Sequence, residues 1–132
     1  MKLTPILACL ATGLIAVTAH AQSADKYPER PIRIIIPYQA GGGTDVMTRI
    51  IVEKVRERTK QPFIIDTKPG ANPLIGVKAL LASPADGYTL MMTSSATFHT
   101  APLVVKNPGY DPLESFSLIS YIAYTPVVFV IN

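Results

Sequence analysis

Apolar and polar positions in the first half of the chain follow two periods in turn. Residues 32–36 form a β-branched run between two prolines, a pattern typical of a buried strand. From residue 44 to about residue 59 the apolar side chains recur about every 3.6 residues, which predicts an amphipathic helix with Thr44 as N-cap and Asp45 in its first turn. We expect this helix to pack on a sheet through Val46, Met47, Ile50, Ile51 and Val55.

The same alternation is then repeated. Residues 63–66 predict a second short strand, and Pro73 suits the first position of a second helix that stops before Pro84. Residues 88–93 predict a third strand. Strands separated by helices of this length predict βαβ units, so we expect an α/β fold with a mainly parallel sheet.

The last third of the sequence is less regular. Residues 108–112 predict a turn, residues 111–114 a cap for a short helix, and residues 116–124 and 127–132 two more strands. An apolar strand with nothing to cover it leaves an edge that invites aggregation. We therefore expect residues 22–132 to be a partial domain, truncated before a second one.

Residues 1–21 have the pattern of a secretory signal peptide. Lys2 supplies a positive charge, residues 3–17 are uncharged and mostly apolar, and Ala19-His20-Ala21 is a small-x-small cleavage site. About 15 such residues are fewer than the roughly 20 that a membrane-spanning helix needs, and a lipoprotein site at Cys9 would leave too short an apolar region. We expect cleavage after Ala21 and a periplasmic product.

Composition narrows the possible functions. The chain has 132 residues, a net charge of +3 and one cysteine, which allows one domain at most. Basic residues alternate with acidic ones and form no stripe, so nucleic acid is not an expected partner. Cys9 leaves with the signal peptide, and His99 is then a lone histidine, so we expect no metal and no cofactor.

Three polar or glycine-rich segments fall at the carboxyl ends of the predicted strands, where ligands bind in parallel α/β sheets. They are residues 38–45, 69–72 and 94–99. Glycine N–H groups and a helix N-terminus favour an anion, and neutral side chains add hydrogen-bond donors. Together they predict a pocket for a small carboxylate, although three glycines can also simply form a tight turn. The residues that carry this prediction are Gly41, Gly42, Gly43, Thr44, Asn72, Ser94, Ser95 and Thr97.

No convincing catalytic set can be assembled from the same segments. A small periplasmic hydrolase that uses Ser94 or Ser95 with His99 is the alternative, but the sequence has no G-x-S-x-G elbow around either serine. A nucleotide-binding loop is also disfavoured, because Val46 stands where the last glycine of G-x-G-x-x-G belongs. We do not expect an enzyme.

Five segments of the sequence resemble the Bug family, the extracytoplasmic solute receptors of tripartite tricarboxylate transporters. They are residues 27–37, 41–45, 68–71, 84–90 and 110–112, in the order the family has them. The resemblance implies a two-domain, monomeric periplasmic binding protein that closes on a small carboxylate and delivers it to a membrane permease. It also implies that this chain is an N-terminal fragment, with a non-functional remnant as a further alternative.

By this resemblance the three loops hold one carboxylate through backbone groups, hydroxyls and waters. The implied ligand set then also includes Tyr38, Gln39, Asp45, Ala71 and His99. The chain departs from the family pattern at Tyr38-Gln39-Ala40, where the family usually has two prolines, and at Pro73-Leu74, where it often has Gly-Asn. The second change removes an N–H and an amide, which argues against a preference for dicarboxylates or tricarboxylates and allows a more apolar acid.

Overall fold

The computed structural model of the chain describes residues 26–71, 73–126 and 128–131. The expected signal peptide with Ala21, and Asn72 of the second loop, lie outside the described residues. The elements in chain order are β1 (Ile32–Ile36), α1 (Gly43–Thr59), β2 (Phe63–Thr67), α2 (Leu74–Leu81), β3 (Thr89–Met91), the 3₁₀ helix η2 (Ser95–Thr97) and α3 (Thr100–Val104). The predicted alternation of strand and helix is confirmed as far as β3.

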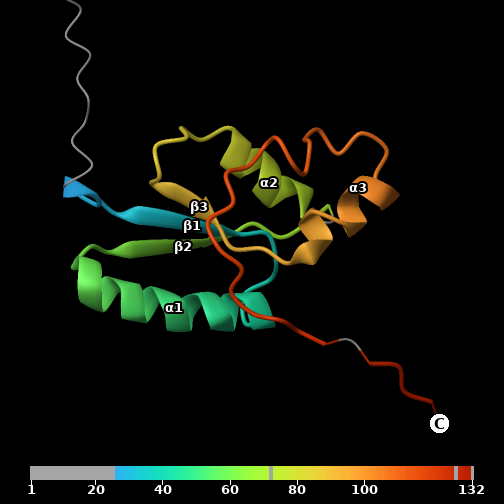
Figure 1. Cartoon of the computed structure of the whole chain (residues 1–132), viewed down its shortest axis with the longest axis horizontal. Helices are drawn as coiled ribbons and strands as arrows, with labels where there is room; N and C mark the ends of the chain where they lie inside the picture. Colours follow the sequence, from blue (N-terminus) through green and yellow to red (C-terminus); the bar gives the residue numbers. More distant parts are fainter. Residues whose placement is uncertain (1–25, 72, 127, 132) are drawn as a thin grey trace, which may run out of the picture.

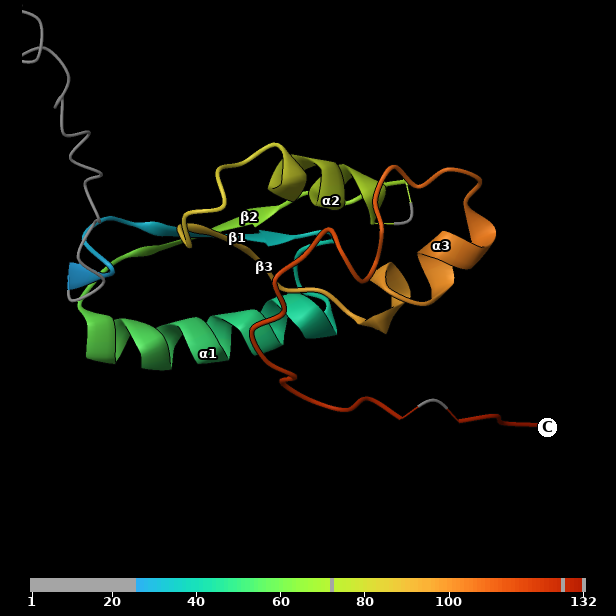
Figure 2. The same cartoon turned by 45° about the horizontal axis from the view of Figure 1, so that its top comes forward.

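The three strands form one parallel sheet in the order β2-β1-β3, so the predicted α/β class is confirmed. Ile34 in the middle of β1 is in register with Ile65 of β2 and Leu90 of β3. Helix α1 lies on one face of the sheet and α2 on the other (Figures 1 and 2). Right-handed crossovers that run in opposite directions along a sheet produce this arrangement.

Strand β1 is the centre of the core, and its side chains alternate between the two helices. The even-numbered isoleucines of β1 form a buried cluster with Val52 of α1. Ile35 is fully buried and faces Gly76 of α2, where an added Cβ would lie 3.4 Å from its Cγ2. Burial on both faces explains why this strand reads as a continuous β-branched run.

Helix α1 begins one residue earlier than predicted, and Thr44 is not its N-cap. Gly42 occupies that position in an extended conformation, with no side chain to cap the helix. Asp45 does lie in the first turn, and its Oδ2 accepts a hydrogen bond from the Gly41 N–H at 2.8 Å. The carboxylate therefore holds the glycine loop at the helix N-terminus.

The face of α1 that packs on the sheet also differs from the prediction. Its buried residues are Asp45, Thr48 and Val52, whereas Val46 is 50% and Ile50 58% exposed, and the other expected core residues are exposed or half-buried. Asp45 is turned inward and bonded to Gly41, and residues three and seven positions later share its face. The buried face of the helix therefore begins with a polar residue.

Helix α2 is confirmed, although Pro73 occupies its N-cap position and not the first helical one. The helix approaches the end of β1 closely at Gly76, where a Cβ would lie 2.6 Å from the Cβ of Pro37. Strand β3 has three residues and is shorter than the predicted 88–93. Among the described residues, no helix is both long and apolar enough to cross a membrane.

The chain beyond β3 departs most from the prediction. Asp111 caps a single turn through the N–H groups of Leu113 and Glu114, where a short helix was expected, and α3 was not expected. The two predicted strands at 116–124 and 127–132 are wrong, because no strand forms in their described part, where Phe129 is fully exposed. In both overall views the last described residues extend away from the fold (Figures 1 and 2), whereas Phe116 packs edge-on against Phe98 and Tyr110. An apolar run forms a strand only where a neighbouring backbone pairs with it.

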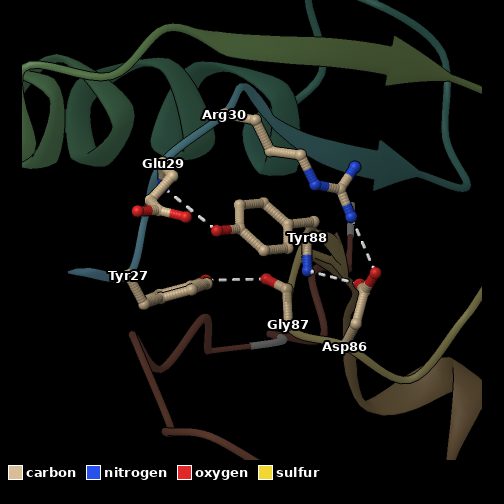
Figure 3. Close-up of polar contacts among 6 residues, drawn as sticks. All are labelled: Tyr27, Glu29, Arg30, Asp86, Gly87 and Tyr88. Carbon is tan, nitrogen blue, oxygen red and sulfur yellow. Dashed lines mark hydrogen bonds and ion pairs between the residues drawn. The ribbon is translucent and has the colours of Figure 1, made fainter. Parts of the chain in front are cut away.

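Two of the segments that carry the family resemblance contact each other at the amino end of the sheet (Figure 3). The Tyr27 hydroxyl donates to the Gly87 carbonyl at 2.7 Å. The Arg30 guanidinium lies 3.9 Å above the Tyr88 ring and forms a 2.7 Å ion pair with Asp86. These contacts connect the start of β1 to the turn before β3. They lie at the amino end of the sheet and do not involve the loops at its carboxyl end.

Candidate functional site at the carboxyl ends of the strands

The strand order places a crevice at the carboxyl end of the sheet. In a parallel sheet with the order 2-1-3, ligands bind outside the ends of the first and third strands, where the order reverses. An open cavity of about 280 Å³ lies at this end. All three of the segments identified in the sequence contribute lining residues, namely Tyr38, Gln39, Pro69, Gly70 and Ala96. Pro37 and Pro73, which adjoin the first and second segments, complete the lining.

Most of the side chains that line the cavity are apolar. Three proline rings, Gly70 and Ala96 contribute no side-chain donors, and none of the lining residues is charged. Polar side chains enter the wall only as Tyr38 and Gln39. An anion here would be held by backbone N–H groups and hydroxyls, because no cationic side chain lines the cavity.

Two N–H groups of the glycine loop already donate hydrogen bonds within the protein. The Gly41 N–H donates to Asp45 at 2.8 Å and the Gly42 N–H to the Gln39 carbonyl at 3.4 Å. Gly41 has a φ of +81°, a conformation that favours glycine. Within the described part of the chain, the N–H groups of Gly43 and Thr44 have no hydrogen-bond partner. They point out of the N-terminus of α1, where an anion is favoured.

Asp45 is buried beside this loop, with 3% of its surface exposed. The Nε atom of Arg49 lies 3.0 Å from its Oδ1, close enough for an ion pair but without the alignment of a hydrogen bond. The Arg49 guanidinium and the Gly41 N–H hold the pKa of this carboxyl below its usual value. An ionised carboxylate that is committed to these two groups is a loop-holding group and a poor general base.

The third loop is tied to the first by Tyr38. The Tyr38 hydroxyl lies 2.7 Å from Ser94 Oγ and 3.2 Å from Thr93 Oγ1, and it accepts the Ser94 N–H at 3.3 Å. Burial would raise the pKa of Tyr38, but hydrogen bonds with Ser94, Thr93 and Thr97 lower it below the usual value. Thr97 itself is fully buried, with its hydroxyl 2.5 Å from that of Thr93.

The remaining expected residues lie around the rim or outside it. Ala71 and Ser95 are exposed, and His99 is exposed with its Nδ1 3.2 Å from the Ser95 carbonyl. No hydrogen bond joins the His99 ring to a serine hydroxyl among the described residues, so the hydrolase alternative gains no support from the geometry. In the described ranges no three His, Cys, Asp or Glu side chains are grouped as a metal site requires.

Sequence reasoning missed several residues that shape the cavity. The sequence pattern indicates only a strand boundary at Pro37 and a polar loop at Ala96, yet both residues line the cavity. Tyr110 was assigned to a turn, yet its hydroxyl donates to the Thr97 carbonyl at 2.5 Å. A proline directly after a buried strand was the available signal, since it stands at the end of the sheet where ligands bind.

Comparison with known sequences identifies relatives over the whole chain. The profile of the family described as "Tripartite tricarboxylate transporter family receptor" matches residues 47–132. BugT of Bordetella pertussis is 37% identical over all of this chain, and a UPF0065 protein of Bordetella bronchiseptica is 32% identical over 93% of it. The chain spans 41% and 37% of the lengths of these two relatives.

Solved structures show the same relationship. The periplasmic binding protein BugD aligns with a TM-score of 0.61 and 38% identity, over 68% of this chain and 30% of its own. R. palustris Rpa4515 with adipate aligns with a TM-score of 0.62 and 34% identity, over 65% of this chain and 29% of its own. MatC from Rhodopseudomonas palustris with bound malate aligns with a TM-score of 0.65 and 26% identity, over 68% of this chain and 31% of its own. The family profile matches more than half of the residues of this chain, and the alignment with BugT covers this chain from end to end. The chain therefore belongs to the tripartite tricarboxylate transporter receptor family.

Proposed function

We propose that this chain is the first part of an extracytoplasmic solute receptor that binds a small carboxylate in the cavity at the carboxyl end of the sheet. One observation carries the proposal: three strand-end loops line one cavity, and α1 begins four residues after the cavity-lining Gln39 with two N–H groups that have no partner among the described residues. A helix N-terminus of this kind stabilises a carboxylate.

The residues inferred from the sequence divide into two roles in this proposal. We infer that the carboxylate is bound by Tyr38 and Gln39, which line the cavity, and by the backbone of Gly43 and Thr44. Ala71, Asn72, Ser95 and His99, which the family resemblance implies or the sequence predicts, complete the proposed set. Gly41, Gly42, Asp45, Ser94 and Thr97 hold the loops, because their polar groups are bonded within the protein. Each hydrogen bond to a charged acceptor contributes about 1.5 to 3 kcal/mol, so four to six of them support binding near the micromolar range.

The apolar wall favours a carboxylate with an apolar body. Adipate and malate accompany two of the similar solved structures, and they differ in the polarity of the chain between their carboxylates. The side chains of three prolines in the lining offer contact to methylene groups and no hydrogen bond to a hydroxyl, which only the Tyr38 and Gln39 side chains of the lining could pair with. We expect adipate to bind this chain more tightly than malate.

The destination of the ligand follows from the same proposal. Residues 1–21 direct export and are removed after Ala21, a second domain completes the cleft, and the monomeric receptor presents the acid to a permease of the tripartite tricarboxylate transporter type. Recovering the chain from the periplasm of a bacterial host and sequencing its N-terminus tests the first step. A mature start at Gln22 supports it, and a start at Met1 contradicts it.

Binding is tested by replacing the first helical residue of α1. Gly43→Pro removes one free N–H, while proline is well tolerated at the first helical position and the preceding Gly42 is already extended. Gly43→Ala is the matched control, because it keeps the N–H and its Cβ meets nothing within 4 Å. By calorimetry with adipate we expect binding about 10- to 100-fold weaker for the proline variant and unchanged for the alanine variant. Folded wild-type chain that binds neither adipate nor malate would overturn the proposal.

A further inference from the structure

The crevice between β1 and β3 is bridged by one side chain. The ladder between these strands ends with the bond from the Met92 N–H to the Ile35 carbonyl at 3.0 Å, and beyond it the two chains separate into the first and third loops. Every hydrogen bond that the described residues form between these loops involves the hydroxyl of Tyr38. That hydroxyl belongs to a residue that also lines the cavity.

Each loop is also held by bonds of its own, from Gly41 to Asp45 in the first and from Thr97 to Ser94 in the third, but among the described residues none of these joins one loop to the other. The first loop contains three consecutive glycines, which lose more conformational freedom on ordering than other residues. Its internal bond from the Gly42 N–H to Gln39 is long, at 3.4 Å. The third loop begins with a comparably long bond of 3.3 Å between the Ala96 N–H and Ser94 Oγ. By contrast, the Tyr38 hydroxyl and Ser94 Oγ are 2.7 Å apart.

The position of the cavity wall depends on the same contact. Ala96, which is the third loop's part of the lining, comes two residues after Ser94 and donates its N–H to Ser94 Oγ. Behind it, Thr97 is fully buried and bonded to Thr93, which also contacts Tyr38. A shift of Ser94 would therefore move Ala96 relative to Tyr38 and change the width of the cavity.

We propose that Tyr38 is the positioning residue of the cavity: its hydroxyl holds Ser94, and through Ser94 the third loop, at the distance from the first loop that a carboxylate needs. This inference rests on the proposed function for the identity of the ligand, but not for the bridge itself. In this inference Ser94 connects Tyr38 to the third loop, and its hydroxyl does not bind the ligand independently of Tyr38.

Tyr38→Phe tests the inference, because it keeps the ring in the cavity wall and removes only the hydroxyl. Tyr27→Phe is the matched control: it loses a hydroxyl bond of the same 2.7 Å length at the opposite end of the sheet. In hydrogen exchange on the 132-residue chain, the amides of residues 94–97 should exchange about tenfold faster in Tyr38→Phe and at the wild-type rate in Tyr27→Phe. Unchanged exchange at residues 94–97 in Tyr38→Phe overturns the inference whether or not any acid binds.

Calorimetry with adipate provides the second measurement. We expect about tenfold weaker binding for Tyr38→Phe and wild-type affinity for Tyr27→Phe. Ser94→Ala should weaken binding to a similar extent, and the double variant should bind no more weakly than either single one, since both changes break one link. Additive losses would show that Ser94 contacts the acid by itself and would overturn the assignment. Wild-type chain that does not bind adipate contradicts the proposed function, and the exchange result then decides the role of Tyr38 alone.

Discussion

Gly76→Ala tests the close packing of α2 on the end of β1. The added Cβ would lie 2.6 Å from the Cβ of Pro37 and 3.0 Å from its Cα, distances that cannot persist without movement. Neither atom can rotate away, because one belongs to a rigid ring and the other to the backbone. Alanine gains about 1 kcal/mol over glycine inside a helix, whereas overpacking of a core costs about 1 to 3 kcal/mol. The short distances place the cost at its upper end, so we expect a net loss of about 1 to 2 kcal/mol.

Urea unfolding followed by far-UV circular dichroism measures this loss directly. In a thermal scan, the melting temperature should fall by about 4 to 8 °C for each kcal/mol of stability lost in a domain of this size. Gly43→Ala is the control, because nothing lies within 4 Å of its Cβ and no clash is created. The packing argument is refuted if Gly76→Ala is as stable as the wild type. Such a result would mean that α2 can move away from Pro37, and with it part of the cavity wall.

Three further predictions concern the sheet, its amino end and the last segment. Hydrogen bonds from the Arg33 guanidinium lower the pKa of Asp66, so the stability from this contact is complete above the usual carboxyl pKa and is lost as the pH falls through the lowered one. Asp66→Asn should therefore destabilise the chain most at pH 7 and progressively less as the pH falls below about 4, and a loss in urea that does not change with pH over this range would contradict this. Arg30→Met should cost only about 1 kcal/mol, because its ion pair with Asp86 is exposed, and a loss above about 3 kcal/mol by the same assay would show a stronger role. Phe129→Ser should change stability by less than about 0.5 kcal/mol, since Phe129 is fully exposed; a larger loss would show that its segment packs on the fold.

Much of the stretch from β1 to β3 could be predicted because its signals are local. The β-branched run of β1 and the apolar period of α1 and α2 report burial within a few residues, and short connections between them favour a parallel sheet. The carboxyl ends of parallel strands lie at one end of the sheet. For this reason the three cavity-lining segments could be named before their contacts were known.

The predictions were wrong where a polar contact or a neighbouring strand decides the outcome. Asp45 lies on the buried face of α1 and accepts a bond from Gly41, an arrangement that hydrophobic periodicity does not record. The apolar residues after Phe116 read as strands, but no neighbouring strand pairs with their described part. Thr97 looked like a free hydroxyl at the cavity and is fully buried.

The sequence by itself determined the strand and helix periods, the end of the sheet that carries the loops, and the family resemblance. Only the tertiary structure decided that Tyr38 meets Ser94, 56 residues away, and that Ala96 and Pro37 share one cavity wall. The physical reason is that backbone periods depend on neighbours along the chain. Contacts between loops depend on how the sheet brings distant strand ends together, and no local pattern encodes that distance.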